Sequence, residues 1–401
     1  MLVLEDPNTS LKTHNLIHDH FIKPQTIKTI FPSKTSGKHI ISCENGMSYH
    51  GDIYYNKKSG YGILYNPDSS INYSGMWKDN KKHGFGVGYY ENGVYKGQWF
   101  ENHHHGQGVY IWKNGDIYEG YWKFDDKSGK GKFIKKDLGV ILEGYWKDDK
   151  MYGKGQKIDK NGRYEGDFID SQEHGRGKFY YNTGEKYKGS WDKGQKSGLG
   201  FFQYSNHHIE YYGYWTNDMR NGQGVQYYED AKYVGNFKNN LRHGNGDYIW
   251  KNEWVYKGQW DEGKCSGMGK IYKPGGILFF DGFFNNFMRT GKGIQYNNNG
   301  KYEGNFKNNK ANGFGVYTWK SGVKFEGNWI EGKRNGPGIV YCNDDVVVKI
   351  DQWNDDEVVE LDPDDKLHHF EGVFFSKSRR NFNKFVRAIR MIAFKGNRKS
   401  I

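Results

Sequence analysis

The stretch "YKGQWFENHHHGQGVYIW", residues 95–112, decides how this chain folds. At its start an aromatic residue, a glycine and a second aromatic residue alternate, and a Gly-x-Gly begins nine residues after that first glycine. Side chains at alternate positions share one face of a β-strand, so both halves of the stretch predict strands. Polar residues between the halves predict a turn, and the whole stretch therefore predicts a β-hairpin.

The same pattern recurs thirteen times, and the Gly-x-Gly always begins nine residues after the first glycine. A Tyr stands two residues before the first glycine in ten repeats, and a Trp stands two residues after it in eight. Units of this size cannot bury a core alone, so we expect neighbouring repeats to stabilise one another. The first glycines are Gly51, Gly75, Gly97, Gly120, Gly144, Gly166, Gly189, Gly213, Gly235, Gly258, Gly282, Gly304 and Gly327. The residues chosen to represent the repeat are Tyr95, Gly97, Trp99, Gly106, Gly108, Tyr118, Gly120, Trp122, Tyr187, Gly189, Trp191, Tyr256, Gly258 and Trp260.

A longer period runs through the array. The spacing from one first glycine to the next cycles through 24, 22 and 23, so three repeats make a 69-residue super-period. Side chains follow the same period, and the two series are His105, His174, His243, Asn312 and Trp112, Tyr181, Trp250, Trp319. Duplication of a three-repeat segment explains the period, and so does a sheet in which every third hairpin meets a periodic partner. The two explanations are compatible.

The composition indicates an unusual core. Aromatic residues make up 17% of the chain and glycines number 56, while the hydrophobic total is only 35%. Glycine weakens a strand unless something covers it, so we expect a ring from the neighbouring strand to lie over each bare backbone segment. Thirteen hairpins give about 26 strands, which at about 4.8 Å each predict a sheet roughly 120 Å long.

This pattern resembles the MORN repeat family (membrane occupation and recognition nexus), and "YKGQW…GQGVYIWKNGDIYEGYW" carries the resemblance. The resemblance covers residues 47–340. It implies an all-β fold, an elongated single-layer antiparallel meander of about 13 MORN β-hairpins, to which the sequence adds a short C-terminal amphipathic helix. The family is known for scaffolding, for ciliary and cytoskeletal assemblies, and for proposed phospholipid contact.

The chain divides into five segments. Residues 1–46 predict an N-terminal arm that covers the first edge strand, and residues 47–343 hold the thirteen repeats. Residues 344–369 begin with an acid-rich stretch and predict a solvated linker. Residues 370–376 contain a half repeat that predicts a cap for the last edge, and residues 377–401 form a basic tail.

The tail changes its hydrophobic period from two to that of a helix. Apolar residues fall on one face and basic residues opposite, which predicts a basic amphipathic helix. Such a helix docks on a protein surface, lies on an acidic membrane or binds calmodulin, and the sequence leaves all three open. The residues predicted to contact a partner or membrane are Arg380, Phe382, Lys384, Phe385, Arg387, Ile389, Arg390 and Ile392.

The motifs that resemble catalytic or metal-binding sites are mostly parts of the repeat pattern. Gly-x-Gly opens a strand thirteen times, so it lacks the helix N-terminus of a phosphate-binding loop. The segment 263–270 resembles such a loop, but its spacing is one residue too long and Ile271 follows where Ser or Thr is needed. His105 belongs to the 69-residue series, whereas His103 and His104 are expected to face water in a turn. We expect no enzyme activity, no metal and no cofactor.

Cysteine use and charge restrict the surroundings. The three cysteines, Cys43, Cys265 and Cys342, make no paired motif and indicate a reducing compartment. The first residues resemble no signal peptide, and no apolar stretch is long enough to span a membrane. The net charge is +12, and because the acidic segment and the basic tail cancel, the excess belongs to the repeats.

Two functions remain. The first is a non-catalytic scaffold in the cytoplasm, in a cilium or flagellum axoneme or a related cytoskeletal assembly, similar to radial spoke proteins with MORN repeats; its partners are other proteins of that large assembly. The second is a peripheral membrane tether that binds anionic phospholipids through the basic surface and the tail helix. We expect no nucleic acid, because the rings are committed to the glycines, and no small-molecule substrate. The oligomeric state stays open.

Overall fold

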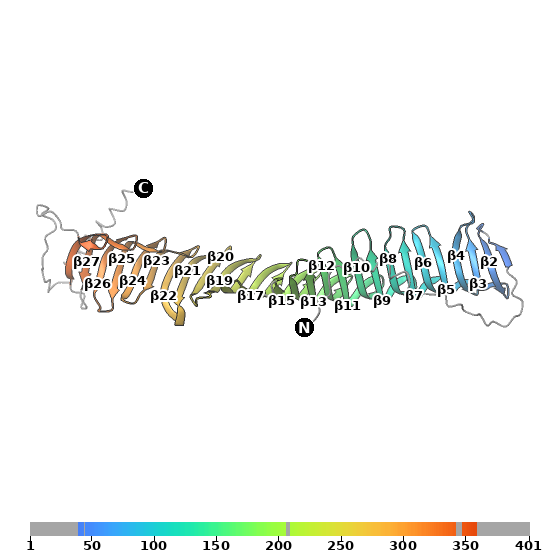
Figure 1. Cartoon of the computed structure of the whole chain (residues 1–401), viewed down its shortest axis with the longest axis horizontal. Coiled ribbons are helices and arrows are strands. Elements are labelled where there is room, and N and C mark those ends of the chain that lie inside the picture. The colour runs from blue at the N-terminus through green and yellow to red at the C-terminus, as the bar shows by residue number, and fades with distance from the viewer. Residues whose placement is uncertain (1–38, 44, 206–208, 342–346, 359–401) are drawn as a thin grey trace, which may run out of the picture. The chain divides into compact units, whose positions relative to one another are not determined.

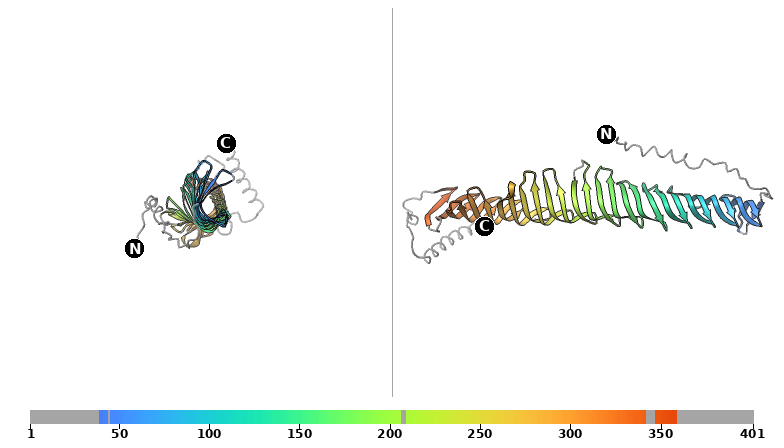
Figure 2. Two further views of the ribbon diagram at one scale, coloured as in Figure 1. Left: turned by 90° about the vertical axis from the view of Figure 1, so that its right-hand side faces the viewer. Right: turned by 90° about the horizontal axis from the view of Figure 1, so that it is seen from below.

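The computed structural model describes residues 39–43, 45–205, 209–341 and 347–358. The chain divides into two units at Tyr110 and Ile111, and each is described by itself. Within each unit the strands follow one another in chain order (Figures 1 and 2). No helix of the described residues is long and apolar enough to cross a membrane.

The first unit contains strands that pair antiparallel with their neighbours in the chain. They are β1 (His39–Ser42), β2 (Ser48–Tyr54), β3 (Lys57–Tyr65), β4 (Ile71–Lys78), β5 (Lys81–Tyr90), β6 (Gly93–Phe100) and β7 (His103–Trp112), which ends just past the boundary.

The second unit continues the same antiparallel order. Its strands are β8 (Ile117–Lys123), β9 (Asp126–Lys135), β10 (Val140–Lys147), β11 (Lys150–Asp159), β12 (Gly162–Ile169), β13 (Gln172–Tyr181), β14 (Lys186–Asp192), β15 (Gln195–Gln203), β16 (Ile209–Thr216), β17 (Met219–Tyr227), β18 (Ala231–Lys238), β19 (Leu241–Trp250), β20 (Val255–Asp261), β21 (Lys264–Lys273), β22 (Ile277–Asn285), β23 (Met288–Tyr296), β24 (Gly300–Lys307), β25 (Lys310–Trp319), β26 (Lys324–Ile330), β27 (Lys333–Tyr341), β28 (Val347–Asn354) and β29 (Glu357–Val358). A short 3-10 turn, Pro274–Gly276, precedes β22.

Each repeat is a hairpin closed by a two-residue turn. Both turn residues have positive φ, as in Asp79 and Asn80, with φ of 49° and 68°. This is the turn whose twist matches that of paired strands, and it favours Asn, Asp and Gly. The first glycine of Gly-x-Gly also has positive φ, +67° at Gly198, and the register shifts within the same hairpin between Gly189 and Trp191. The Gly-x-Gly therefore makes a β-bulge, which explains why its first member is always glycine.

The two remaining glycines of a repeat lie opposite each other under a tyrosine ring. Gly189 pairs with Gly200, and a β-carbon on either would lie 2.3 Å from the Tyr187 hydroxyl. That hydroxyl donates to the Ser190 carbonyl at 3.0 Å, and nine other tyrosines make the same bond. Rings therefore cover the glycines as expected, but each ring comes from the strand of its own first glycine and covers both strands.

The second aromatic residue joins one repeat to the previous one. Trp191 lies edge-on to Tyr187 of its own repeat at 5.3 Å and to Tyr164 of the previous repeat at 5.0 Å. Indole nitrogens donate to the second glycine of the previous Gly-x-Gly, as from Trp260 to the Gly246 carbonyl at 3.0 Å. The core is thus a one-dimensional ladder in which each step depends on its neighbours.

The structure confirms the predicted all-β antiparallel meander, and it changes the picture at both flanks. Within the predicted arm, β1 pairs antiparallel with β2. The acidic segment is not simply a linker, because β28 pairs with β27 and buries Trp353. Trp353 occupies the second aromatic position of a degenerate repeat, with Asp351 where the first glycine stands elsewhere. The predicted cap at 370–376 and the tail lie outside the described residues.

Candidate functional site

The sheet has two different faces. We call the face that carries the Tyr and Trp rings the front face, and the opposite one the reverse face. On the front face one further position stands out, two residues before each Gly-x-Gly and directly opposite the second aromatic residue, as Lys196 is opposite Trp191. We call it the slot. The slot residues are Lys58, Lys82, His104, Lys127, Met151, Glu173, Lys196, Arg220, Arg242, Cys265, Arg289, Ala311 and Arg334.

A cation fills the slot in eight of these thirteen repeats. The ammonium of Lys196 lies over four rings, at 5.3 Å from Tyr181, 5.5 Å from Tyr187, 5.7 Å from Phe202 and 5.1 Å from Trp215. Burial lowers the pKa of Lys196, partly offset by Asp218. Cation–π contacts of partly buried groups are each worth about 0.5–2 kcal/mol. The rings thus form a cage around the ammonium group, and their cation–π contacts offset part of the cost of burying it.

Two aromatic residues of the 69-residue series are walls of such cages. Tyr181 closes the cage of Lys196 in the following repeat, and Trp112 lies 5.7 Å from the ammonium of Lys127 in the same way. Each of these aromatic residues ends a strand that precedes the caged residue by one hairpin. The series therefore has a structural role inside the array.

In the arginine slots the cage includes a backbone acceptor. Arg242 lies 4.3 Å from the Trp260 ring and donates from Nη2 to the Gly263 carbonyl at 2.6 Å. Gly263 is the second residue of the next hairpin turn. Arg220, Arg289 and Arg334 donate to the corresponding turn carbonyls. A guanidinium in the slot therefore makes cation–π contacts with the rings and a hydrogen bond to the carbonyl of the next turn.

The backbone of the slot also clamps the next turn. The Asp218 amide donates to the Lys196 carbonyl at 3.2 Å, and the Lys196 amide donates to the Asp218 side chain at 3.0 Å. Where the turn residue is Gly194, Gly263 or Gly332, only the backbone half of this clamp is made. Those glycines recur with the 69-residue period, so every third junction over this part of the chain has a weaker clamp.

In three repeats without a cation in the slot, another side chain fills the space or an ion pair balances the charge. Met151 is fully buried beside Leu142, the one repeat without a ring before its first glycine, and its methyl covers the glycine pair. At Cys265 the ring of Phe287 from the next turn lies 5.4 Å from Trp260. At Glu173 the buried carboxylate accepts from Lys157 Nζ at 2.8 Å.

His104 corrects the sequence prediction. Glu101 and Asn102 form the turn, and His104 occupies a slot in β7. Its ring is buried, stacks on Tyr95 with centroids 3.8 Å apart, and lies 2.8 Å from the Tyr90 hydroxyl through Nε2. The prediction of a water-facing turn was wrong because the alternation along the strand turns this residue to the front face. His103 is exposed, but it too lies in the strand.

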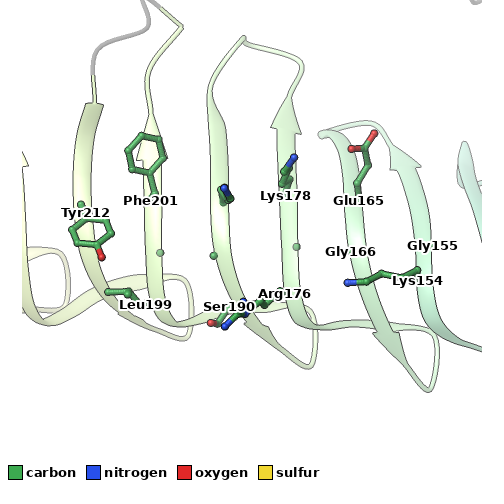
Figure 3. A pocket seen from close by; sticks show the side chains of 14 residues that line it. Lys154, Gly155, Glu165, Gly166, Arg176, Lys178, Ser190, Leu199, Phe201 and Tyr212 are labelled. Atoms are coloured by element: carbon green, nitrogen blue, oxygen red, sulfur yellow. The ribbon is translucent and has the colours of Figure 1, made fainter.

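The reverse face carries a groove in the second unit (Figure 3). It has a volume of about 860 Å³ and crosses the strands from β11 to β16. One half is lined by Lys154, Arg176, Lys178 and Lys188, and the other by apolar side chains that include Leu199, Phe201 and Tyr212.

The basic half of the groove places two lysines side by side, and Glu165 on β12 is directly opposite one of them, Lys178. Lys178 is directly opposite Lys188 on the neighbouring strand, and both are exposed. Like charges in this arrangement are destabilising. Lys154 is paired with Asp167 at 2.7 Å, but no acid of the described residues lies within 4 Å of the Lys178 or Lys188 ammonium. An acidic ligand would relieve their repulsion.

The apolar half exposes side chains that a soluble surface usually hides. Leu199 is opposite Tyr214 and Phe201 is opposite Tyr212, so the four form a compact cross-strand block. The exposed fractions are 43% for Leu199, 48% for Tyr212 and 52% for Tyr214. Contiguous exposed apolar side chains beside a polar rim are typical of an interaction surface.

The sequence located the rings and glycines of the repeat, and the structure places them in the core. Tyr95, Trp99, Tyr118, Tyr187 and Trp260 are all buried. The slot series was missed, although aligning the repeats on Gly-x-Gly shows a Lys or Arg in most of them. The predicted tail contacts, Arg380 to Ile392, lie outside the described residues.

The family model described as MORN repeat matches most of the chain. Its matches cover residues 49–71, 73–94, 95–117, 118–140, 143–162, 164–186, 187–209, 211–230, 233–255, 256–277, 302–324 and 325–346. Residues 278–301 fall between two matches, yet β22 and β23 form a hairpin there with Phe280 and Phe284 buried.

Curated relatives share the repeats over part of the chain. Alsin of Rattus norvegicus is 29% identical over 163 residues, which is 32% of this chain and 10% of that protein. Alsin of Homo sapiens is 30% identical over 162 residues, 38% of this chain and 10% of that protein. MORN repeat-containing protein 3 of Xenopus laevis is 34% identical over 76 residues, 18% of this chain and 32% of that protein. The chain therefore spans about a tenth of the length of the alsins it matches.

Among solved structures, the wild-type TCP10 domain of Danio rerio CPAP has a TM-score of 0.19 and 9% identity. The match covers 61% of this chain and 99% of that one. A TM-score this low supports no comparison of the two folds.

Proposed function

Because the chain belongs to the MORN repeat family, we propose that it is a non-catalytic scaffold that binds a partner protein on its reverse face. The observation that carries this proposal is the groove across β11–β16, where the unpaired Lys178 and Lys188 lie beside the exposed Leu199 and Tyr212. The front face is less available to a partner, because most of its rings already pack against one another and against the slot cations.

The chemistry of the groove indicates the kind of partner. The two lysines favour acidic side chains, and the block around Tyr212 favours an apolar anchor beside them. Glu165 and the Lys154–Asp167 ion pair lie on the same face. This mixture of charges and apolar groups suits a protein segment better than a uniform layer of anionic headgroups.

The proposed setting is a cilium or a related cytoskeletal assembly of the cytoplasm. This part of the proposal rests on the family resemblance of the repeats. It is tested by fractionating cells of the native source into axonemal, soluble and membrane parts. Recovery with axonemes supports the setting, and recovery with non-ciliary membranes alone contradicts it.

Site-specific crosslinking tests the groove. A photoreactive phenylalanine analogue replaces Tyr212 in the full chain, and a control chain carries it at Tyr54, which is exposed beside a hairpin turn of the first unit. We expect partner adducts from position 212 that disappear in the double variant Lys178→Glu/Lys188→Glu. The matched charge control is Lys123→Glu/Lys147→Glu, two exposed lysines at strand ends. Adducts that survive charge reversal in the groove would contradict the proposal.

The alternative proposal, a peripheral membrane tether, is tested with lipid vesicles and with a chain that lacks residues 377–401. Co-sedimentation with vesicles of anionic phospholipid would fall with rising salt and with removal of residues 377–401. Strong binding of this kind without crosslinked protein partners would favour the tether over the scaffold.

A further inference from the structure

The slot at Ala311 differs from all the others. Its side chain is a single methyl group, whereas the corresponding slots of the 69-residue period hold His104, Glu173 and Arg242. The turn residue that follows is Gly332, and a β-carbon there would have nothing within 4 Å. At Cys265, the other small slot residue, the following turn instead supplies the Phe287 ring.

Three rings around Ala311 are nevertheless placed as in the cage of Arg242, whose fourth ring, Tyr228, has Asn297 as its counterpart 69 residues further along the chain. Tyr302 and Trp329 have centroids 5.0 Å apart at an interplanar angle of 73°, and Tyr317 and Trp329 are 6.3 Å apart at 39°. In the cage of Arg242, the equivalent pairs are 5.1 Å at 76° and 5.9 Å at 38°. These three rings therefore keep, without a guanidinium of their own, the arrangement that they have around Arg242.

Two rings of the cage at Ala311 are slightly more exposed than their counterparts in the cage of Arg242, although both are buried. Tyr302 is 4% exposed, while the other nine tyrosines in its position are each 0% exposed. Trp329 is 8% exposed, against 2% for Trp260 beside Arg242. Ala311 itself is half-exposed. The exposure of Tyr302 is as expected for a methyl group in place of a long slot side chain, and that of Trp329 equals the 8% of Trp353 beside Arg334.

We propose that the Ala311 cage binds the guanidinium of an arginine on a partner protein. The ligand takes the place that Arg242 takes in its own cage, over the faces of Tyr302, Tyr317 and Trp329. The Gly332 carbonyl is equivalent to the Gly263 carbonyl that accepts from Arg242, so it supplies the matching acceptor. Arginine is favoured over lysine because all four arginine slots make this hydrogen bond.

The proposal rests on the scaffold function, since it names a second contact for a partner protein, but its test is independent of the reverse-face groove. The full chain is labelled with 5-fluorotryptophan, and the ¹⁹F resonance of Trp329 is assigned with Trp329→Phe. The probe is N-acetyl-arginine amide, and its uncharged isostere N-acetyl-citrulline amide is the control.

We expect the arginine probe to shift the Trp329 resonance in a saturable way and the citrulline probe to shift it at least tenfold less. Ala311→Arg places in this slot the residue found in the equivalent repeat, and we expect it to move the Trp329 resonance without probe and abolish the response. Arg242→Ala opens the equivalent cage, so Trp260 should then respond.

Two results would overturn the proposal. The first is that the arginine probe does not shift the Trp329 resonance of the unmodified chain at concentrations that saturate Trp260 in the Arg242→Ala variant, or that it shifts neither resonance. The second is an unchanged response of Trp329 in Ala311→Arg. Failure of the crosslinks at position 212 would count against the groove and would leave these results unaffected.

Discussion

The repeat at Gly144 offers a quantitative test of how rings cover glycines. Here Leu142 replaces the usual Tyr, and Met151 occupies the slot. β-Carbons built on Gly144 and Gly155 would lie 2.6 and 2.0 Å from the Met151 methyl, the place that a tyrosine hydroxyl takes in other repeats. Leu142→Tyr and Met151→Lys together would restore the common pattern.

The expected energies follow from the packing. Met151→Lys uncovers the glycine pair and removes a fully buried side chain, which should cost about 3 kcal/mol of local stability. Leu142→Tyr alone forces a hydroxyl into the space of the methionine methyl and should cost about 2 kcal/mol by overpacking. The double variant should lie within about 1 kcal/mol of the original chain, since a lysine over a tyrosine is the arrangement at Lys82 and Tyr73. The coupling is then about 4–6 kcal/mol, above the range of about 0.5–3 kcal/mol that is usual for residues in contact.

Hydrogen exchange measured by mass spectrometry is the suitable assay, because a repeat array need not unfold in one step. Opening free energies are compared for peptides from β10 and β11 in the four chains of the cycle. Peptides from β24 and β25, far along the chain, serve as the internal control. Additive losses in the double variant would refute the reasoning, because they would mean that leucine and methionine do not substitute jointly for the ring.

Three further predictions concern the repeat as a whole. Burial raises the pKa of Tyr49 and Tyr211 to about 12. Their contribution to the free energy of unfolding is therefore complete below pH 10 and is lost as the pH rises from about 10 to 12. Absorbance at 295 nm should show these tyrosines ionising only as the chain unfolds, and ionisation before unfolding would contradict the prediction. Gly200→Ala places a β-carbon 2.3 Å from the Tyr187 hydroxyl and should lower exchange protection by about 2–3 kcal/mol, while Gly198→Ala meets only backbone strain at φ +67° and should lower it by about 1–2 kcal/mol. Gly263→Asn adds the missing side-chain half of a clamp, onto the Arg242 amide, and should raise protection at that junction by about 0.5–1 kcal/mol; Asn240→Gly, which removes the 2.8 Å bond from the Arg220 amide, is the control and should lower it.

Much of the fold could be predicted because the strongest signals were local. The spacing of Tyr187, Gly189 and Trp191 fixes a strand face, and the constant nine-residue gap to Gly-x-Gly fixes a hairpin. β28 could not be predicted in this way, because Asp351 replaces the first glycine and no Gly-x-Gly follows within the strand pair. Strand β28 retains Trp353, and the centre of its ring lies 3.8 Å from the Arg334 guanidinium. A strand at the end of such an array can therefore lose the glycine pattern as long as it supplies the next ring.

The slot series and the reverse-face groove were harder to predict, for a different reason. Lys178 and Lys188 are separated in the sequence by a hairpin turn, and only the register of β13 and β14 shows that they are opposite. The slot residues are one per repeat and vary in chemistry, so composition alone hides them.

The 69-residue period acquires a physical meaning once the slots are known. Two of its aromatic members, Trp112 and Tyr181, lie over the caged lysine of the next repeat. Its glycine turns, Gly194, Gly263 and Gly332, follow the slots of Glu173, Arg242 and Ala311. The slot side chain varies most in the class of repeat that holds Glu173, Arg242 and Ala311. The following turn glycine lacks the side-chain half of the clamp but keeps its backbone bond to the slot residue. Duplication of three repeats explains how the period arose. The cage at Ala311 has no cation of its own, as at Met151 and Cys265 in the other two classes, and the rings of the ladder around it stay in place.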